Sequence, residues 1–96
     1  MKAINTTKAP SAIGPYSQAI SKTGMTFISG QLPIDANTGE FAGEDITSQA
    51  TQSLDNIKHI VEEAGSSMSN IVKTTILLAN IDDFVEVNKV YATYFN

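Results

Sequence analysis

Four positions carry residue types suited to holding a small polar ligand: Tyr16, Ser29, Gly30 and Asn88. Tyr16 follows a Gly-Pro turn that can present its hydroxyl, although tyrosine is as common at amphipathic core or surface positions. Ser29 and Gly30 end a predicted strand, where a glycine lets a ligand approach the backbone, although a bulge or close packing explains glycine equally well. Asn88 interrupts the apolar side of a predicted helix, so we expect a buried amide that either satisfies backbone groups of a neighbouring element or lines a polar pocket.

Most other chemistries lack their residues in this chain. With no cysteine and one histidine, the usual zinc clusters are excluded, and no glycine-rich loop followed by lysine and serine or threonine is present to hold a nucleotide phosphate. Ser29 lacks the Gly-x-Ser-x-Gly elbow of a nucleophilic serine. His59 falls on the polar side of a predicted helix, and we expect it to be a solvated surface residue rather than a catalytic base. We therefore expect no metal and no cofactor.

Charge and hydropathy limit the partners. Ten carboxylates oppose six basic residues, all of them lysines spaced singly, and the net charge is -4. Proteins that bind nucleic acid gather lysine and arginine on one surface, so we expect no nucleic-acid partner. No apolar run approaches the roughly 18 residues that span a bilayer, and the N-terminal residues do not resemble a secretory signal. We expect no membrane partner and a cytoplasmic location.

The first half of the chain predicts a loop and two strands that position Tyr16, Ser29 and Gly30. Prolines and glycines mark turns, whereas alternating and β-branched residues favour strands. In chain order the predicted elements are a loop at 9–15, a short strand at 17–20, a tight turn at 22–24, a strand at 25–32 and a reversal at 33–40.

A helix is predicted to start at Asp45, because its carboxylate can cap the free N–H groups of the first turn. Apolar residues recur at steps of three and four from this point, and Gly65 can take the left-handed conformation that ends a helix. The apolar stripe comprises Ile46, Ala50, Leu54, Ile57, Val61 and Ala64.

The last third predicts a strand and a second helix. Residues 71–79 are rich in β-branched side chains and carry apolar residues on both alternating faces, which is typical of a strand covered on two sides. A helix opens at Asp82-Asp83, with Phe84, Val87, Tyr91 and Phe95 on one side. The order favours an α+β fold with both helices on one face of a sheet, so a second copy must bury the other apolar face.

Five groups of residues, in order over nearly the whole chain, resemble the motifs of the RidA family, also called the YjgF family. The matching segments are 12–19, 29–33 with 38–40, 52–57, 71–75 and 83–88. Members are 2-iminobutanoate/2-iminopropanoate deaminases, which hydrolyse short 2-imino acids to 2-keto acids and ammonia without a metal or cofactor. The resemblance implies one chorismate-mutase-like α+β domain over residues 1–96 and a homotrimer with a central barrel.

By the same resemblance, Tyr16, Ser29, Gly30 and Asn88 line a substrate cleft between neighbouring subunits. The arginine that binds the substrate carboxylate and the glutamate that positions water follow the second helix in the family, which places them beyond Asn96. We therefore expect the domain to be C-terminally incomplete, without its last strands, and the catalytic residues to be unknown within these residues. A noncatalytic module that binds small carboxylates is the alternative function. RNA cleavage or translational inhibition, also attached to the family, is disfavoured by an acidic chain without arginine.

Overall fold

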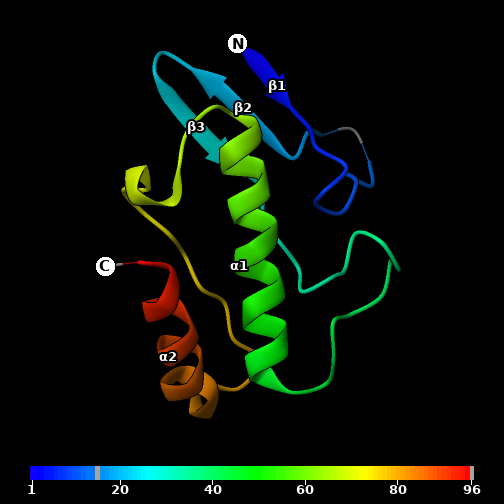
Figure 1. The fold of residues 1–96 in the computed structure, drawn as a ribbon, viewed down its shortest axis with the longest axis vertical. Helices are drawn as coiled ribbons and strands as arrows, with labels where there is room; N and C mark the ends of the chain where they lie inside the picture. The colour runs from blue at the N-terminus through cyan, green and yellow to red at the C-terminus, as the bar shows by residue number, and fades with distance from the viewer. Residues whose placement is uncertain (15, 96) are drawn as a thin grey trace.

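A computed structural model describes residues 1–14 and 16–95, which form a small antiparallel sheet and two α-helices (Figure 1). The strands are β1 (Lys2–Ile4), β2 (Ala19–Lys22) and β3 (Met25–Ile28), in the spatial order β1-β2-β3. The helices are α1 (Ile46–Glu63) and α2 (Phe84–Tyr94), with short 3-10 helices η1 (Met68–Asn70) and η2 (Ile81–Asp83) between them. The predicted α+β class is confirmed.

The hairpin of β2 and β3 forms around the predicted tight turn. Thr23 and Gly24 both have positive φ, 52° and 80°, as a two-residue turn between twisted antiparallel strands requires. Ile20 pairs with Phe27 across the hairpin. The second strand ends at Ile28, before the predicted boundary, and β1 was not predicted because three residues are too few to show a periodic pattern. The end of β3 therefore leaves Ser29 and Gly30 in a loop.

Both predicted ends of α1 are confirmed. The Asp45 carboxylate accepts a hydrogen bond from the Ser48 N–H at 2.9 Å, and this bond lowers the pKa of Asp45. Gly65 follows the helix with a φ of 84°, in the left-handed region that glycine adopts without steric cost. The helix buries Ile60 completely against Ile4 and other core residues, although Ile60 lies outside the predicted stripe. Its C-terminal half thus anchors the sheet.

Helix α2 packs along α1 and runs in the same direction beside its first half, as Figure 1 shows. Val87 and Val90 are buried, and the rings of Tyr91 and Phe95 lie 4.4 Å apart. Helical structure begins one residue before the predicted start, at Ile81 in η2. None of the helices within the described part of the chain is long and apolar enough to cross a membrane.

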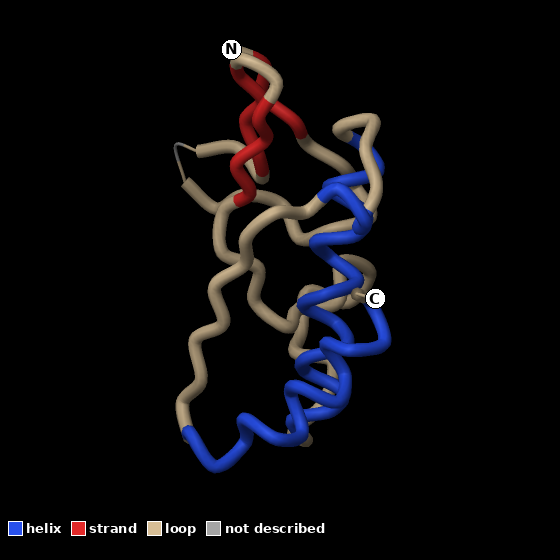
Figure 2. The backbone as a smooth tube through the Cα atoms, turned by 90° about the vertical axis from the view of Figure 1, so that its left-hand side faces the viewer, coloured by secondary structure: helices blue, strands red, loops and turns tan. Residues whose placement is uncertain are grey.

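Residues 71–79 correct the prediction of a strand covered on both sides. Within the described ranges this segment pairs with no strand, and Figure 2 shows it as part of a long loop, whereas the strands cluster at one end of the structure. Val72 and Leu77 are 85% and 91% exposed. Apolar residues on both faces indicate that a segment must be buried on both sides. They do not make it a strand, because an extended backbone becomes a strand only when another backbone pairs with it.

Candidate functional site

Ser29 and Gly30 directly follow β3, and hydrogen bonds connect Ser29 to the segment that carries Tyr16. The Gln18 carbonyl accepts hydrogen bonds from the N–H and the hydroxyl of Ser29, at 3.0 and 3.1 Å. Tyr16 precedes Gln18 by two residues, and its side chain is 55% exposed. Gly30 is exposed, and a Cβ built on it would meet no heavy atom within 4 Å. The open space beside Gly30 supports ligand approach rather than close packing within the chain.

The Tyr16 hydroxyl is free to donate to a ligand. Its oxygen accepts a long hydrogen bond from the Ile13 N–H, at 3.4 Å, and among the described residues the phenol proton has no acceptor. The Tyr16 N–H donates to the Gly14 carbonyl at 2.9 Å, which closes a tight turn of the loop. The predicted presentation of Tyr16 by a turn is thus supported by this local geometry.

Two buried amides hold the loops around this group, and the sequence reasoning assigned a role to neither. Gln18 is 2% exposed and Asn56 is fully buried. The Asn56 side-chain amide donates to the carbonyls of Leu32 and Ile34, at 3.2 and 3.0 Å, and so fixes the loop that follows Gly30. Both amides lie inside segments that carry the family resemblance, 12–19 and 52–57. Their place in these motifs could have indicated a structural role.

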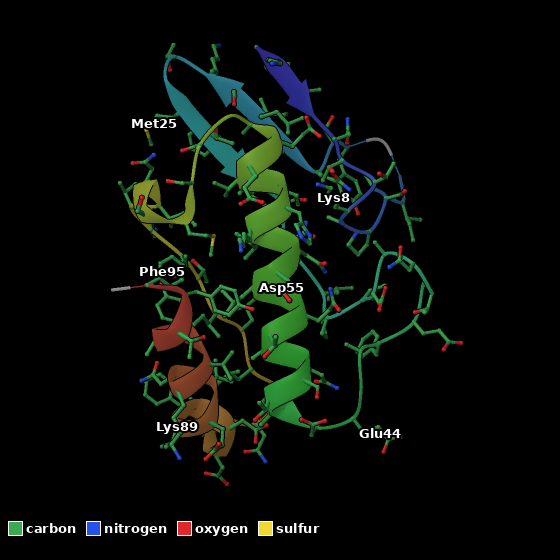
Figure 3. The ribbon with its side chains drawn as sticks, viewed as in Figure 1. Lys8, Met25, Glu44, Asp55, Lys89 and Phe95 are labelled. Atoms are coloured by element: carbon green, nitrogen blue, oxygen red, sulfur yellow. The ribbon has the colours of Figure 1, made fainter. Side chains whose placement is uncertain are left out.

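Asn88 lies apart from the other three residues, and its predicted burial is wrong. Its side chain is exposed because α2 turns Val87 and Val90 toward α1 instead. No hydrogen bond within the described ranges joins Asn88 to Tyr16, Ser29 or their neighbours. Figure 3 labels the adjacent Lys89 at the end of the molecule away from the sheet. One chain therefore contains two separate parts of the predicted cleft.

A polar hollow of about 370 Å³ lies between the N-terminal loop and α1. Lys8, Asp35, Asp55 and His59 are among its lining residues, and Figure 3 shows Lys8 on the loop and Asp55 on the helix. The His59 Nδ1 lies 3.0 Å from the Lys8 carbonyl, which can only accept, so Nδ1 carries a proton. His59 is thus a half-exposed surface residue, as expected, and its exposed hydrogen bond joins α1 to the N-terminal loop.

A second hollow, of about 490 Å³, lies between α2 and the chain after η1. Lys73, Tyr91 and Tyr94 are among its lining residues. None of the four predicted site residues lines either hollow. Among the residues that the structure describes, no group of three or more histidine, cysteine or acidic side chains is placed to hold a metal ion.

Tyr94 ties the end of α2 to the middle of α1. Its hydroxyl donates to the Asp55 carboxylate at 2.6 Å and approaches the Thr51 carbonyl at 3.3 Å. Burial raises the pKa of Tyr94, and the hydrogen bond to Asp55 and its negative charge raise it further. The protonated phenol is therefore a structural donor in this contact.

The sequence matches a known family and several curated proteins. The pattern described as Endoribonuclease L-PSP covers residues 6–96. A mouse protein named 2-iminobutanoate/2-iminopropanoate deaminase is 47% identical over 94 residues, which are 98% of this chain and 70% of the mouse protein. A protein of the same name from Salmonella typhimurium is 48% identical over 94 residues, 98% of this chain and 73% of that protein. A RutC family protein of Pyrococcus abyssi is 49% identical over 92 residues, 96% of this chain and 72% of its own.

Solved structures share the backbone of this chain. The crystal structure of Escherichia coli TdcF with bound serine has a TM-score of 0.94 at 42% sequence identity. The match covers 98% of this chain and 73% of the TdcF chain. RidA from an Antarctic Psychrobacter has a TM-score of 0.95 at 40% identity, covering 100% of this chain and 77% of that one. Sequence and backbone therefore agree on the same group of proteins.

Proposed function

This chain belongs to the RidA family, matched by the Endoribonuclease L-PSP pattern, and on that premise we propose that the protein containing it, the product of the complete gene, hydrolyses short 2-imino acids to 2-keto acids and ammonia. The structural observation that carries the proposal is the exposed backbone at Gly30 after β3, beside Ser29, whose hydrogen bonds to Gln18 connect it to the segment that carries the exposed Tyr16. Several relatives carry only the RutC family name, so the reaction is a proposal for this chain.

The reaction needs positioned donors and acceptors rather than a covalent intermediate. Water adds to C2 of the protonated imine, and its oxygen becomes the keto oxygen when the C–N bond breaks and ammonia leaves. Donors near C2 stabilise the developing charge of the tetrahedral adduct, which is typically the largest contribution of such a site. The Tyr16 hydroxyl and the backbone at Gly30 are exposed to supply hydrogen bonds of this kind. Because water and the protonated imine supply every atom, the proposal includes no metal or cofactor.

We propose that the working protein is a homotrimer in which the cleft lies between neighbours. In one chain the Gln18 network connects Ser29 to the segment of Tyr16, whereas Asn88 lies exposed on α2, so we infer that a site using all four residues takes Asn88 from a second copy. Large exposed apolar side chains are available for burial between copies, among them Phe27, Leu32, Val72 and Leu77. The proposal keeps the cytoplasmic location expected from the sequence.

A coupled assay tests the reaction on the product of the complete gene. The substrate 2-iminopropanoate is generated in the cuvette, and pyruvate is followed by its enzymatic reduction. We expect pyruvate to form faster than in buffer alone, and Tyr16→Phe and Ser29→Ala to reduce the rate. A purified wild-type protein with no rate above buffer would refute the proposed activity.

Binding of a small carboxylate without turnover is the second candidate. The bound serine in the related TdcF structure favours this function, because serine offers a carboxylate and an amine of similar size to a short imino acid. Calorimetry with pyruvate or serine, run beside the assay, separates the two: saturable binding with no hydrolysis selects the binding function. RNA cleavage has less support, because the six lysines are dispersed and the net charge is -4.

A further inference from the structure

We infer that Gln18 is a positioning residue that joins the Tyr16 loop to Ser29 and sets the direction in which the Ser29 hydroxyl forms hydrogen bonds. The inference rests on the proposed imine hydrolysis, because it gives Ser29 a specific role toward the substrate. It adds a residue outside the four predicted ligand-binding positions.

The side chain of Gln18 satisfies a loop that has few other partners. Its Nε2 lies 3.0 Å from the Thr6 carbonyl, 3.2 Å from that of Ala9 and 2.7 Å from that of Pro10. Its Oε1 accepts a hydrogen bond from the Thr6 N–H at 2.6 Å. An amide is the one uncharged side-chain group that offers two donor hydrogens beside an acceptor oxygen. At 2% exposure, water cannot replace these bonds.

The main chain of Gln18 extends the same network to Ser29. The Gln18 N–H donates to the Asn5 side chain at 3.2 Å. The Gln18 carbonyl accepts from both the N–H and the hydroxyl of Ser29. The next residue, Ala19, pairs with Ile28 across the hairpin. A shift of Gln18 must therefore move Ser29 together with the loop that carries Tyr16.

The hydrogen bond from Ser29 decides what its oxygen offers to a ligand. A hydroxyl has one proton, and Ser29 donates it to the Gln18 carbonyl, so only lone pairs face the open side. The oxygen can accept from the N–H of a protonated imine, but it cannot donate to a carboxylate while this bond holds. Before ammonia leaves, the nitrogen of the adduct takes a proton from the added water, and an acceptor at this place stabilises the resulting ammonium form by accepting from its N–H. Among the residues that the structure describes, no base is bonded to the hydroxyl, so Ser29 is placed as an acceptor rather than a nucleophile.

A double-mutant cycle tests the inference in the product of the complete gene. The variants are Gln18→Met, Ser29→Ala and the pair, and Gln49→Met is the control because its Nε2 makes one bond to a carbonyl, that of Gly43, at 2.9 Å. We expect Gln18→Met to lower kcat by about 100-fold, the cost of a small misplacement of reacting groups. The pair should be close to the worse single variant, because Gln18→Met is expected to displace the Ser29 hydroxyl that Ser29→Ala removes. Additive losses, or an unchanged kcat in folded Gln18→Met, would overturn the inference.

Hydrogen exchange separates this inference from the proposed activity. The Ser29 and Thr6 amides should exchange faster in Gln18→Met and unchanged in Gln49→Met, whatever the protein catalyses. If the wild type hydrolyses no imine but these amides respond, the proposed function fails and the positioning role stands. If Gln18→Met does not fold, Gln18→Glu replaces it, because a protonated glutamate still donates one of the bonds. Protection of Ser29 should then recover as the pH is lowered, and protection equal to wild type at all pH values would overturn the inference.

Discussion

The loops around Gln18 and the segment 71–79 both lie outside the strands. Within the described residues, only the carbonyls of the loops accept hydrogen bonds from buried side-chain amides. Buried amides at Gln18 and Asn56 bond the carbonyls of the loops, so these loops need no strand partner. Among the described residues, the side-chain hydrogen bond of segment 71–79 is that of Thr74 with the Tyr91 hydroxyl, and Val72 and Leu77 are exposed. Unpaired chain is therefore stabilised either by side-chain amides of its own molecule or by hydrogen bonds to a neighbouring backbone.

The largest expected effect concerns catalysis by residues 1–96 expressed alone. These residues contain no arginine, so no planar guanidinium can bind a substrate carboxylate with two hydrogen bonds. We expect hydrolysis of 2-iminopropanoate at the buffer rate, at least about 100-fold below the product of the complete gene. The check is the pyruvate assay on both proteins, with masses confirmed. Equal rates would show that residues 1–96 contain every residue that catalysis needs.

Replacing Asn56 should destabilise the loop that its buried amide bonds. In Asn56→Leu the part-buried hydrogen bonds to the carbonyls of Leu32 and Ile34 are lost, at a cost of about 1–3 kcal/mol of unfolding free energy. The measurement is urea unfolding of the 96-residue chain. Asn88→Leu is the matched control, because the same change at an exposed site should leave the unfolding free energy nearly unchanged. A similar loss in both variants would contradict the contrast between the two amides.

A charge introduced into segment 71–79 should weaken the association of copies without changing the fold of one chain. Leu77→Asp places a carboxylate on a side chain that is 91% exposed in one chain, so the fold of the chain should tolerate it. If copies bury this segment, the unpaired charge should raise the concentration at which the complete gene product dissociates by about tenfold or more. Sedimentation velocity measures the shift, with exposed Thr47→Asp as the control. No shift would remove segment 71–79 from the interface.

Asn88 should affect ligand binding more than folding. If a neighbour supplies Asn88 to the cleft, Asn88→Leu should weaken pyruvate binding by the complete gene product by about tenfold, as expected for one lost polar contact of roughly 1 kcal/mol or more. Calorimetry measures the affinity, and sedimentation shows whether the assembly is retained. Unchanged affinity in an intact assembly would exclude Asn88 from the site.

The smallest effect is expected where α2 meets α1. Tyr94→Phe removes the hydrogen bond to Asp55 and should lower the unfolding free energy by about 1 kcal/mol. Because the pKa of Tyr94 in the folded chain is raised above its usual value of 10.0, its contribution is present below that pH and is lost as the pH rises past it. Urea unfolding of both proteins across this range should show the difference shrinking with pH. A constant difference would mean that the phenol proton is not what stabilises the contact.

Local signals in the sequence were sufficient for the elements whose stability is local. The N-cap at Asp45, the glycine exit at Gly65 and the hairpin turn at Thr23-Gly24 each depend on a few adjacent residues, and each is found as predicted. The grouping of Ser29 and Gly30 after a strand is of the same kind. Backbone geometry within one turn is set by residue type, which is why the sequence determined these features.

Tertiary structure alone decided which polar groups are buried and which extended segment pairs. Gln18 and Asn56 have the same composition of donors and acceptors as Gln49 and Asn88, and nothing in residue type marks the first two as buried. Segment 71–79 carries the pattern of a covered strand, but it pairs with none within the described ranges. Burial and strand pairing depend on atoms from distant parts of the chain or from another chain, so they are properties of the assembled structure rather than of a local pattern.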